Sequence, residues 1–111
     1  MIEKNSESIR NDSNFFAKTV TIKNLSWTQK QSLFVSVISP ASMNFESKIE
    51  ISVGNITANA KSASEIMAKF FPFNLFSGIL FPRIVDVTIS AEGSDAEDAV
   101  KTLVNLIENF H

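Results

Sequence analysis

Few residues in this sequence carry side chains suited to catalysis, and they do not form a familiar reactive set. The 111 residues include no cysteine, and the only histidine is the last residue, His111. Such a chain offers no thiol nucleophile and few ligands for a transition metal. Its three glycines do not form the glycine-rich loop that cradles a phosphate. We therefore expect no enzymatic activity, no metal site and no bound cofactor.

Two pairs of residues fit a capping box, in which a serine and a glutamate satisfy amide donors at the start of a helix. Ser62 precedes Glu65 by three residues, and Ser94 precedes Glu97 by the same spacing. The carboxylates that follow Ser94 also suit the positive end of a helix dipole. We interpret this acidic group as helix-capping charge and not as a catalytic carboxylate pair.

The most unusual stretch is KFFPFNLFSGILFPRI, residues 69–84. It holds five of the ten phenylalanines of the chain, yet it also contains Pro72, Gly78 and Pro82. These three residues interrupt a regular helix, so the sequence predicts a Phe-rich loop inserted at residues 70–83. Even as a helix, its apolar part would extend only about 18 Å, against a hydrocarbon core of about 30 Å. No transmembrane segment is expected.

Two interpretations of the Phe-rich loop remain open. Its phenylalanines either fold back to extend the core of a small domain, or form an exposed patch that binds a partner protein or a second copy of the chain. Peripheral membrane contact is a minor third interpretation, because few basic residues flank the loop. The candidate partner-binding residues are its large apolar ones: Phe70, Phe71, Phe73, Leu75, Phe76, Ile79, Leu80 and Phe81.

Four segments alternate between apolar and polar residues with the period of a half-buried strand. They are residues 19–23, 49–53, 56–60 and 84–91, and the Gly54-Asn55 pair between the second and third predicts a tight hairpin turn. Because only one face of each strand is apolar, we expect an antiparallel sheet that is covered on one side.

Three segments are predicted to be helical. Residues 94–110 repeat apolar side chains at helical spacing, and residues 62–71 form a shorter helix that ends at Pro72. Residues 29–45, QKQSLFVSVISPASMNF, fit two structures, because their β-branched residues favour a strand while their apolar residues share one helical face. We interpret them as a helix that is kinked or ends near Pro40.

The length fits a single domain, at residues 18–111. A flexible, polar tail at residues 1–17 precedes it, without the apolar region of a secretory signal. The net charge of −2 and the isoelectric point near 5.3 provide no electrostatic surface for nucleic acid. The absence of cysteine is compatible with a cytoplasmic location.

The order strand, helix, strand, strand, helix, strand, helix comes with residues that resemble HPr, the phosphocarrier protein of the bacterial sugar phosphotransferase system. DVTISAEGSDAEDAVKTLVNLI looks like the last strand, turn and helix of that family. KSASEIM is similar to the start of its second helix, and PASMNFESKIEISVGN to the segment that enters its hairpin. The resemblance covers residues 18–111 without the Phe-rich loop. It implies an α+β fold, an open-faced β-sandwich of four antiparallel strands with three helices on one face.

HPr carries a phosphoryl group on the histidine of a Gly-Ile-His-Ala-Arg-Pro motif just before its first helix. The arginine and the helix N-terminus stabilise the anion. Counting back without gaps from Lys61 places Gln31 at the histidine and Leu33 at the arginine. Glutamine does not accept a phosphoryl group and leucine does not pair with phosphate. The resemblance therefore implies a scaffold that has lost its carrier site.

Ser62 falls where many HPr proteins carry a regulatory serine that a kinase phosphorylates, although its capping-box pattern favours a helix cap. In the family, the first two helices and the loop after the second form the apolar surface that docks enzymes and regulators. We therefore expect a non-catalytic cytoplasmic bacterial protein that acts through protein–protein contacts, with a regulatory role in sugar phosphotransfer or carbon control. The alternative is a phosphocarrier that uses an unexpected acceptor residue.

Overall fold

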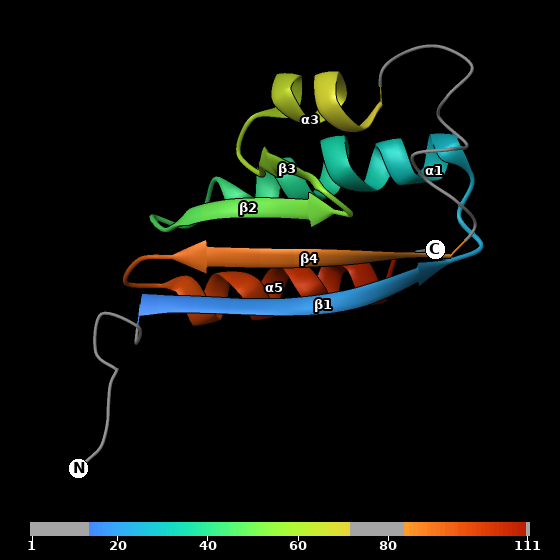
Figure 1. Ribbon diagram of the computed structural model, residues 1–111. Helices are drawn as coiled ribbons and strands as arrows, with labels where there is room; N and C mark the ends of the chain where they lie inside the picture. Colours follow the sequence, from blue (N-terminus) through green and yellow to red (C-terminus); the bar gives the residue numbers. More distant parts are fainter. Residues whose placement is uncertain (1–13, 72–83, 111) are drawn as a thin grey trace.

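The computed structural model describes residues 14–71 and 84–110 of the chain (Figure 1). In chain order its elements are β1 (Phe15–Lys23), α1 (Trp27–Gln31), the π-helix η2 (Ser32–Ile38), α2 (Ser39–Ser42), β2 (Lys48–Val53), β3 (Ile56–Asn59), α3 (Ala63–Phe70), β4 (Ile84–Glu92) and α5 (Ala96–Glu108). Because α1, η2 and α2 follow one another without a break, we call them together the first helix.

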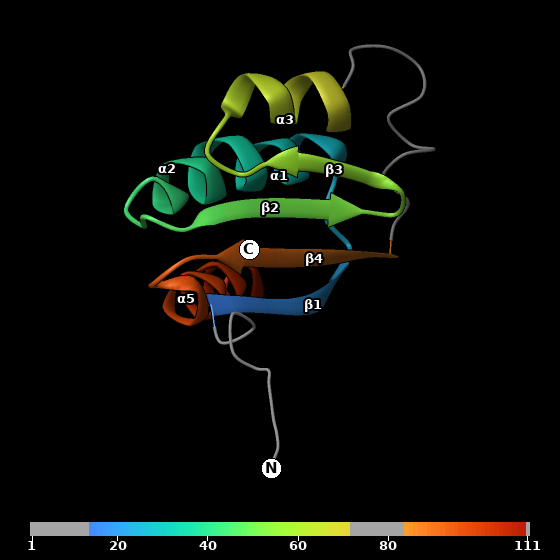
Figure 2. The same cartoon turned by 60° about the vertical axis from the view of Figure 1, so that its left-hand side comes forward.

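The four strands form one antiparallel sheet in the order β1-β4-β2-β3. Figures 1 and 2 show that the helices lie together on one face of this sheet and leave the other face open. This arrangement confirms the predicted α+β fold, an open-faced sandwich of four antiparallel strands and three helices, when the first helix is counted once.

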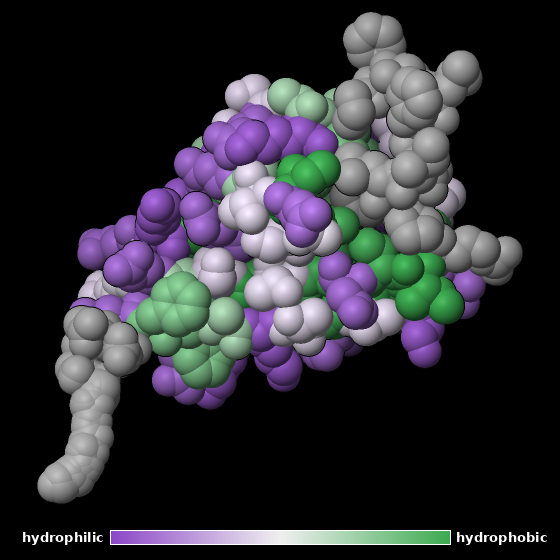
Figure 3. All heavy atoms as spheres, in the orientation of Figure 1, coloured by the Kyte–Doolittle hydropathy of each residue, from purple (hydrophilic) through white to green (hydrophobic). Residues whose placement is uncertain are grey.

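The open face of the sheet carries a row of hydroxyl groups. Thr19, Thr88, Ser52 and Thr57 lie opposite one another, one from each strand. The hydroxyl oxygens of Thr19 and Thr88 are 2.7 Å apart, and those of Ser52 and Thr57 are 2.9 Å apart. Figure 3 shows a mostly polar surface, pale and purple, over the middle of this face. The hydrophobic core therefore lies on the opposite, helical side of the sheet.

Alternate residues of each strand and one apolar face of each helix form that core. Burial alternates along β2 and β4 as predicted, with a buried residue at every second position. The largest fully buried side chains are Phe34, Phe70, Phe71, Leu33, Ile38, Ile49, Ile51, Ile66, Ile89, Leu103, Val87 and Val100.

The ambiguous segment from residue 29 is helical as far as Ser42, and a π-helical stretch explains how Pro40 is accommodated. In an α-helix, proline lacks the amide hydrogen and its ring collides with the carbonyl group four residues earlier. In the wider η2, the amide of Ser39 donates to the carbonyl of Phe34, five residues back. This widening relieves the collision, so the helix continues for two residues beyond Pro40.

Two predicted boundaries are wrong. β1 begins at Phe15, which pairs with Glu92 of β4, so the predicted end of the tail at residue 17 lies inside the strand. The last helix begins at Ala96, after Asp95 as its N-cap residue, and no side-chain cap is formed there. The capping box predicted between Ser94 and Glu97 is therefore absent.

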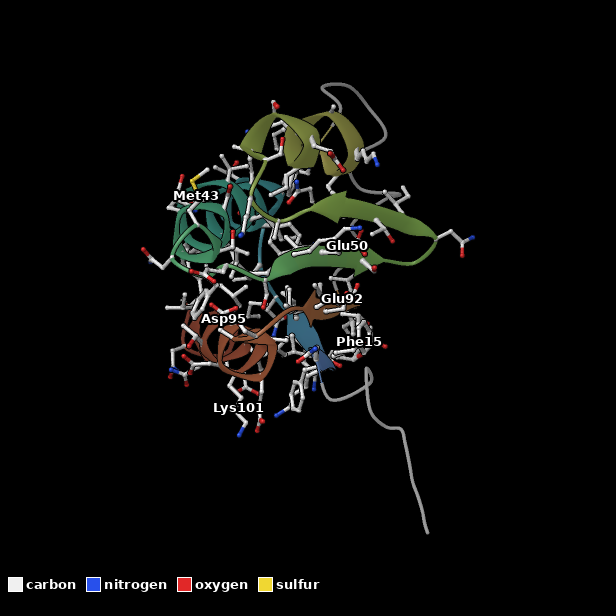
Figure 4. The ribbon with its side chains drawn as sticks, turned by 90° about the vertical axis from the view of Figure 1, so that its left-hand side faces the viewer. Phe15, Met43, Glu50, Glu92, Asp95 and Lys101 are labelled. Atoms are coloured by element: carbon white, nitrogen blue, oxygen red, sulfur yellow. The ribbon has the colours of Figure 1, made fainter. Side chains whose placement is uncertain are left out.

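The side chain of Asp95 binds another segment of the chain, which explains the missing cap. Its carboxylate accepts hydrogen bonds from the backbone amides of Glu46, at 2.8 Å, and Ser47, at 2.9 Å, and from the Ser47 hydroxyl. Figure 4 shows Asp95 at the start of α5, turned toward the segment that enters β2. The Ser47 hydroxyl and the Glu46 amide lower the pKa of the Asp95 carboxyl. Asp95 thus ties α5 to β2.

Candidate functional site

The start of the first helix is the position at which the resemblance places a reactive group. Asn24 has a positive φ of 63°, a conformation that asparagine and glycine adopt more readily than other residues. Ser26 follows as the N-cap: its hydroxyl accepts from the Gln29 amide at 3.1 Å, and the Gln29 side chain accepts from the Ser26 amide at 2.8 Å. Both side chains therefore satisfy helix-terminal amides.

This capping box is not among the predicted ones, although its signal is present in the sequence. A serine followed three residues later by glutamine, ahead of an apolar run, is the pattern that marks a helix start. The pattern at Ser26 and Gln29 sets the first residue of the helix at Trp27, two positions before the segment predicted to be helical.

Gln31 does not lie just before the first helix, and Leu33 does not lie on the surface. Gln31 is the last residue of α1, and its side-chain amide donates to the Met67 sulfur of α3 at 3.4 Å. Leu33 is fully buried in the core. The gap-free count therefore does not bring Gln31 to the start of the helix, because the residue that precedes the helix is Ser26, five residues earlier.

A buried lysine lies in the first turns of this helix. Lys30 is only 2% exposed, and its burial lowers the pKa of the ammonium group below the ordinary value. It is also the only charged residue between Trp27 and Ser42. The exposed side of the first helix consequently carries hydroxyl and amide groups and no charge, with Thr28, Gln29, Ser32 and Ser36 exposed.

An aromatic cluster joins the first helix to α3. The ring centroid of Phe71 is 5.8 Å from that of Trp27 and 5.9 Å from that of Phe34, both edge-on, and Phe70 is 6.0 Å from Phe34. Phe70 and Phe71 were predicted to bind a partner, but both are buried. The reason is that α3 extends to Phe70, four residues after buried Ile66 on the same helix face.

The other six predicted partner-binding residues lie outside the described part of the chain. They are Phe73, Leu75, Phe76, Ile79, Leu80 and Phe81. Phe71 is the last described residue before them, and its ring lies beside that of Trp27 at the start of the first helix.

Ser62 is the N-cap of α3, as its pattern predicted. Its hydroxyl accepts from the Glu65 amide at 3.1 Å. The reciprocal half of the predicted box is absent, because the Glu65 carboxylate accepts from the Asn59 amide at 2.9 Å and pairs with Lys69 at 3.3 Å. These two interactions lower the pKa of the Glu65 carboxyl. A phosphate on Ser62 would displace the cap and lie close to this carboxylate.

The described residues show neither a metal centre nor a membrane span. Within residues 14–71 and 84–110, no three side chains of the types that bind metal ions are grouped together. In the same part of the chain, no helix combines the length and apolar character required to cross a bilayer. The helix start at Ser26 also has no arginine near it in this part, since Arg10 and Arg83 are the only two in the sequence.

Sequence comparison and structural comparison give different results. No family model matches the chain, and no curated protein matches its sequence. A crystal structure of HPr from Thermoanaerobacter tengcongensis matches with a TM-score of 0.59 at 33% identity, covering 84% of this chain and 91% of that one. The phosphocarrier protein HPr of Bacillus anthracis matches with a TM-score of 0.61 at 23% identity, covering 84% and 96% of the two chains.

A third match extends the same likeness to another group of bacteria. The histidine-containing phosphocarrier protein of a mycoplasma has a TM-score of 0.59 at 20% identity, covering 80% of this chain and 90% of that one. The two matches of lower identity support the fold. The Thermoanaerobacter match adds 33% sequence identity over an alignment that covers 91% of the Thermoanaerobacter chain.

Proposed function

The chain belongs to the HPr family of phosphocarrier proteins, and we propose that it is a member that binds other proteins without carrying a phosphoryl group on histidine. The observation that carries this proposal is the start of the first helix. The family motif places its histidine just before that helix, and here the residue just before the helix is Ser26, whose hydroxyl is engaged as the N-cap. The only histidine is His111, at the other end of the chain.

The chemistry of a carrier supports this reading. A carrier must accept a phosphoryl group and then release it, which a phosphorylated imidazole does readily and a serine phosphoester does not. Leu33, which the gap-free count aligned with the arginine, is buried in the core, and no described residue near Ser26 is an arginine. The alternative of a carrier with an unexpected acceptor would require Ser26 to give up its bond to the Gln29 amide.

The surface that we propose for docking is formed by the exposed side of the first helix and by the Phe-rich segment. The helix offers the uncharged residues Thr28, Ser32 and Ser36, with Val35 and Met67 of α3 partly exposed beside them. Such a surface loses little solvation of charge when a partner covers it. The apolar contribution would come from the six remaining residues: Phe73, Leu75, Phe76, Ile79, Leu80 and Phe81.

Within this proposal, the protein acts in the cytoplasm of a bacterium and regulates sugar phosphotransfer or carbon control through its partner. Family membership supports the pathway, and the neutral face of the first helix supports recognition by apolar and hydrogen-bonding contacts. Fold alone does not determine function, so the proposal depends on a binding experiment.

The experiment compares three baits in a pull-down with proteins identified by mass spectrometry. They are the wild type, a double variant Phe73→Ser/Phe76→Ser, and a control Ile84→Ser, which removes a 62% exposed apolar side chain from the open face of the sheet. We expect a partner that the wild type and Ile84→Ser retain and the double variant loses, while its free energy of unfolding stays close to that of the wild type.

Two results would contradict the proposal. The first is a double variant that captures the same proteins as the wild type. The second is a double variant whose free energy of unfolding falls by several kcal/mol, as large-to-small core changes cause. That second result would support the other interpretation, in which the segment folds back onto the core.

A further inference from the structure

The two edges of the sheet differ in whether their backbone groups are occupied. At the β3 edge, the carbonyl of Thr57 accepts from the Lys69 ammonium at 2.9 Å, and the amide of Asn59 donates to the Glu65 carboxylate at 2.9 Å. The Asn59 carbonyl also accepts from the Ser62 amide at 3.1 Å. Side chains and backbone of α3 therefore cover this edge and prevent another strand from pairing with it.

The β1 edge has no such cover in the described part of the chain. The Gly93 amide donates to the Asn14 carbonyl at 2.8 Å, so the backbone carbonyl of Asn14 points toward β4. Because backbone groups alternate in direction along a strand, the amides and carbonyls of residues 16, 18, 20 and 22 also point toward β4. Residues 15, 17, 19, 21 and 23 then direct their amides and carbonyls outward. Within residues 14–71 and 84–110, these outward groups have no hydrogen-bond partner.

A groove runs along the helical side of this open edge. Its volume is about 540 Å³, and it lies between residues 19–23 of β1 and the last residues of the chain that the structure describes. Its apolar lining comes from Val20, Ile22, Leu25, Ile107 and Phe110, with Glu108 as its acidic group. Figures 1 and 2 show β1 at the edge of the sheet with α5 behind it. A strand added to β1 would place alternate side chains in this groove.

We propose that a second copy of the chain occupies this edge, with β1 of each copy paired antiparallel around a two-fold axis at Thr19. A nine-residue strand centred on that axis pairs over its whole length, since Thr19 meets the partner's Thr19 and residue 15 meets the partner's residue 23. All the outward amides and carbonyls at the odd positions are then satisfied, and two four-stranded sheets become one sheet of eight.

Two features of the chain make it complementary to itself in this register. The partner's Phe16 lies opposite Ile22, beside the apolar groove, and Phe16 is one of the partly buried residues that face the helical side of the sheet. The partner's Lys18 lies opposite Val20, on the same side of the sheet as Glu108. Lys18 of each copy therefore faces the groove of the other copy, which carries the Glu108 carboxylate. The two-fold symmetry forms this lysine–glutamate pair twice.

The first test is a matched pair of proline substitutions measured by sedimentation equilibrium over a range of concentrations. The Thr19→Pro variant loses an amide hydrogen that points away from β4, so the backbone hydrogen bonds between β1 and β4 within the monomer are kept. Thr57→Pro does the same at the covered β3 edge, and each variant also loses one cross-strand hydroxyl pair. We expect Thr19→Pro to weaken the dimer at least tenfold and Thr57→Pro to leave it unchanged.

The second test reverses the proposed ion pair and does not depend on proline. Lys18→Glu and Glu108→Lys should each weaken the dimer, and the double variant should restore it toward the affinity of the wild type. A wild type that remains monomeric at millimolar concentration would overturn the proposal. So would a dimer that Thr19→Pro does not weaken, or a double variant that associates no better than either single one. These results do not depend on the Phe-rich segment, whose double serine variant should still dimerise.

Discussion

Replacing Phe71 by alanine tests whether the end of α3 belongs to the core. The Phe71 side chain is 2% exposed, and its ring lies edge-on to both Trp27 and Phe34. Burial of a phenylalanine removes about 150–250 Å² from water, which at about 25 cal/mol per Å² corresponds to about 4–6 kcal/mol as an upper bound. Measured truncations of phenylalanine cost about 3–5 kcal/mol. We expect a loss of about 3–5 kcal/mol in the free energy of unfolding.

The assay is urea unfolding followed by far-ultraviolet circular dichroism, because the fluorescence of Trp27 itself would change when its neighbouring ring is removed. Met43→Ala is the matched control, since this apolar side chain is 64% exposed and its loss should change the free energy of unfolding by less than about 0.5 kcal/mol. If Phe71→Ala costs less than about 1 kcal/mol, the ring does not support the core. Its assignment as a partner-binding residue would then be restored.

Two further substitutions test the contacts at helix starts. Ser62→Ala should lower the free energy of unfolding by about 1 kcal/mol and Ser62→Asp should be tolerated, whereas efficient phosphorylation of Ser62 by HPr kinase would show that the residue is more than a cap. Asp95→Asn should reduce stability at neutral pH, because it weakens the bonds to Ser47 and Glu46. The folded-state pKa of Asp95 lies below its ordinary value of 3.8, so its contribution is present above that pH and is lost as the pH falls through the folded-state pKa. Unfolding midpoints measured from pH 7 to pH 2 should therefore fall less steeply below pH 4 in Asp95→Asn than in the wild type, and parallel profiles would contradict this role.

The sheet could be predicted from the sequence because each strand has one apolar and one polar face. The alternation of Ile49, Ile51 and Val53, and of Val87 and Ile89, is local information, and the structure buries all of these residues. The cap at Ser62 is local in the same sense, since its partner is the amide three residues later.

Contacts between distant segments could not be predicted in this way. The carboxylate of Asp95 binds Ser47, 48 residues earlier in the chain. Patterns of residue spacing within one helix or strand do not predict a contact over such a distance in the sequence. Similarly, Phe70 and Phe71 belong to an apolar stretch whose composition suits both a surface patch and a core, and only their packing against Phe34 distinguishes the two.

The position of the candidate site was missed for a different reason. The gap-free count from Lys61 assumed that this chain and its relatives have equal lengths between the first helix and the second. The structure starts the first helix after Ser26, five residues before Gln31, so the count does not bring Gln31 to the helix start. The π-helical stretch before Pro40 was equally hidden, because residue propensities do not distinguish a wide helical turn from a normal one.

We propose that this member of the HPr family does not carry a phosphoryl group on histidine. The most direct measurement incubates the intact chain with phosphoenolpyruvate and the phosphoenolpyruvate-dependent enzyme that charges HPr, with a histidine-containing HPr as the positive control, and records intact masses at neutral pH. We expect the control to gain a phosphoryl group that acid removes, and this chain to gain none. An acid-labile, base-stable phosphoryl group on this chain would contradict the account, and a phosphoryl group on Ser26 that acid leaves in place would show that the helix cap is an acceptor.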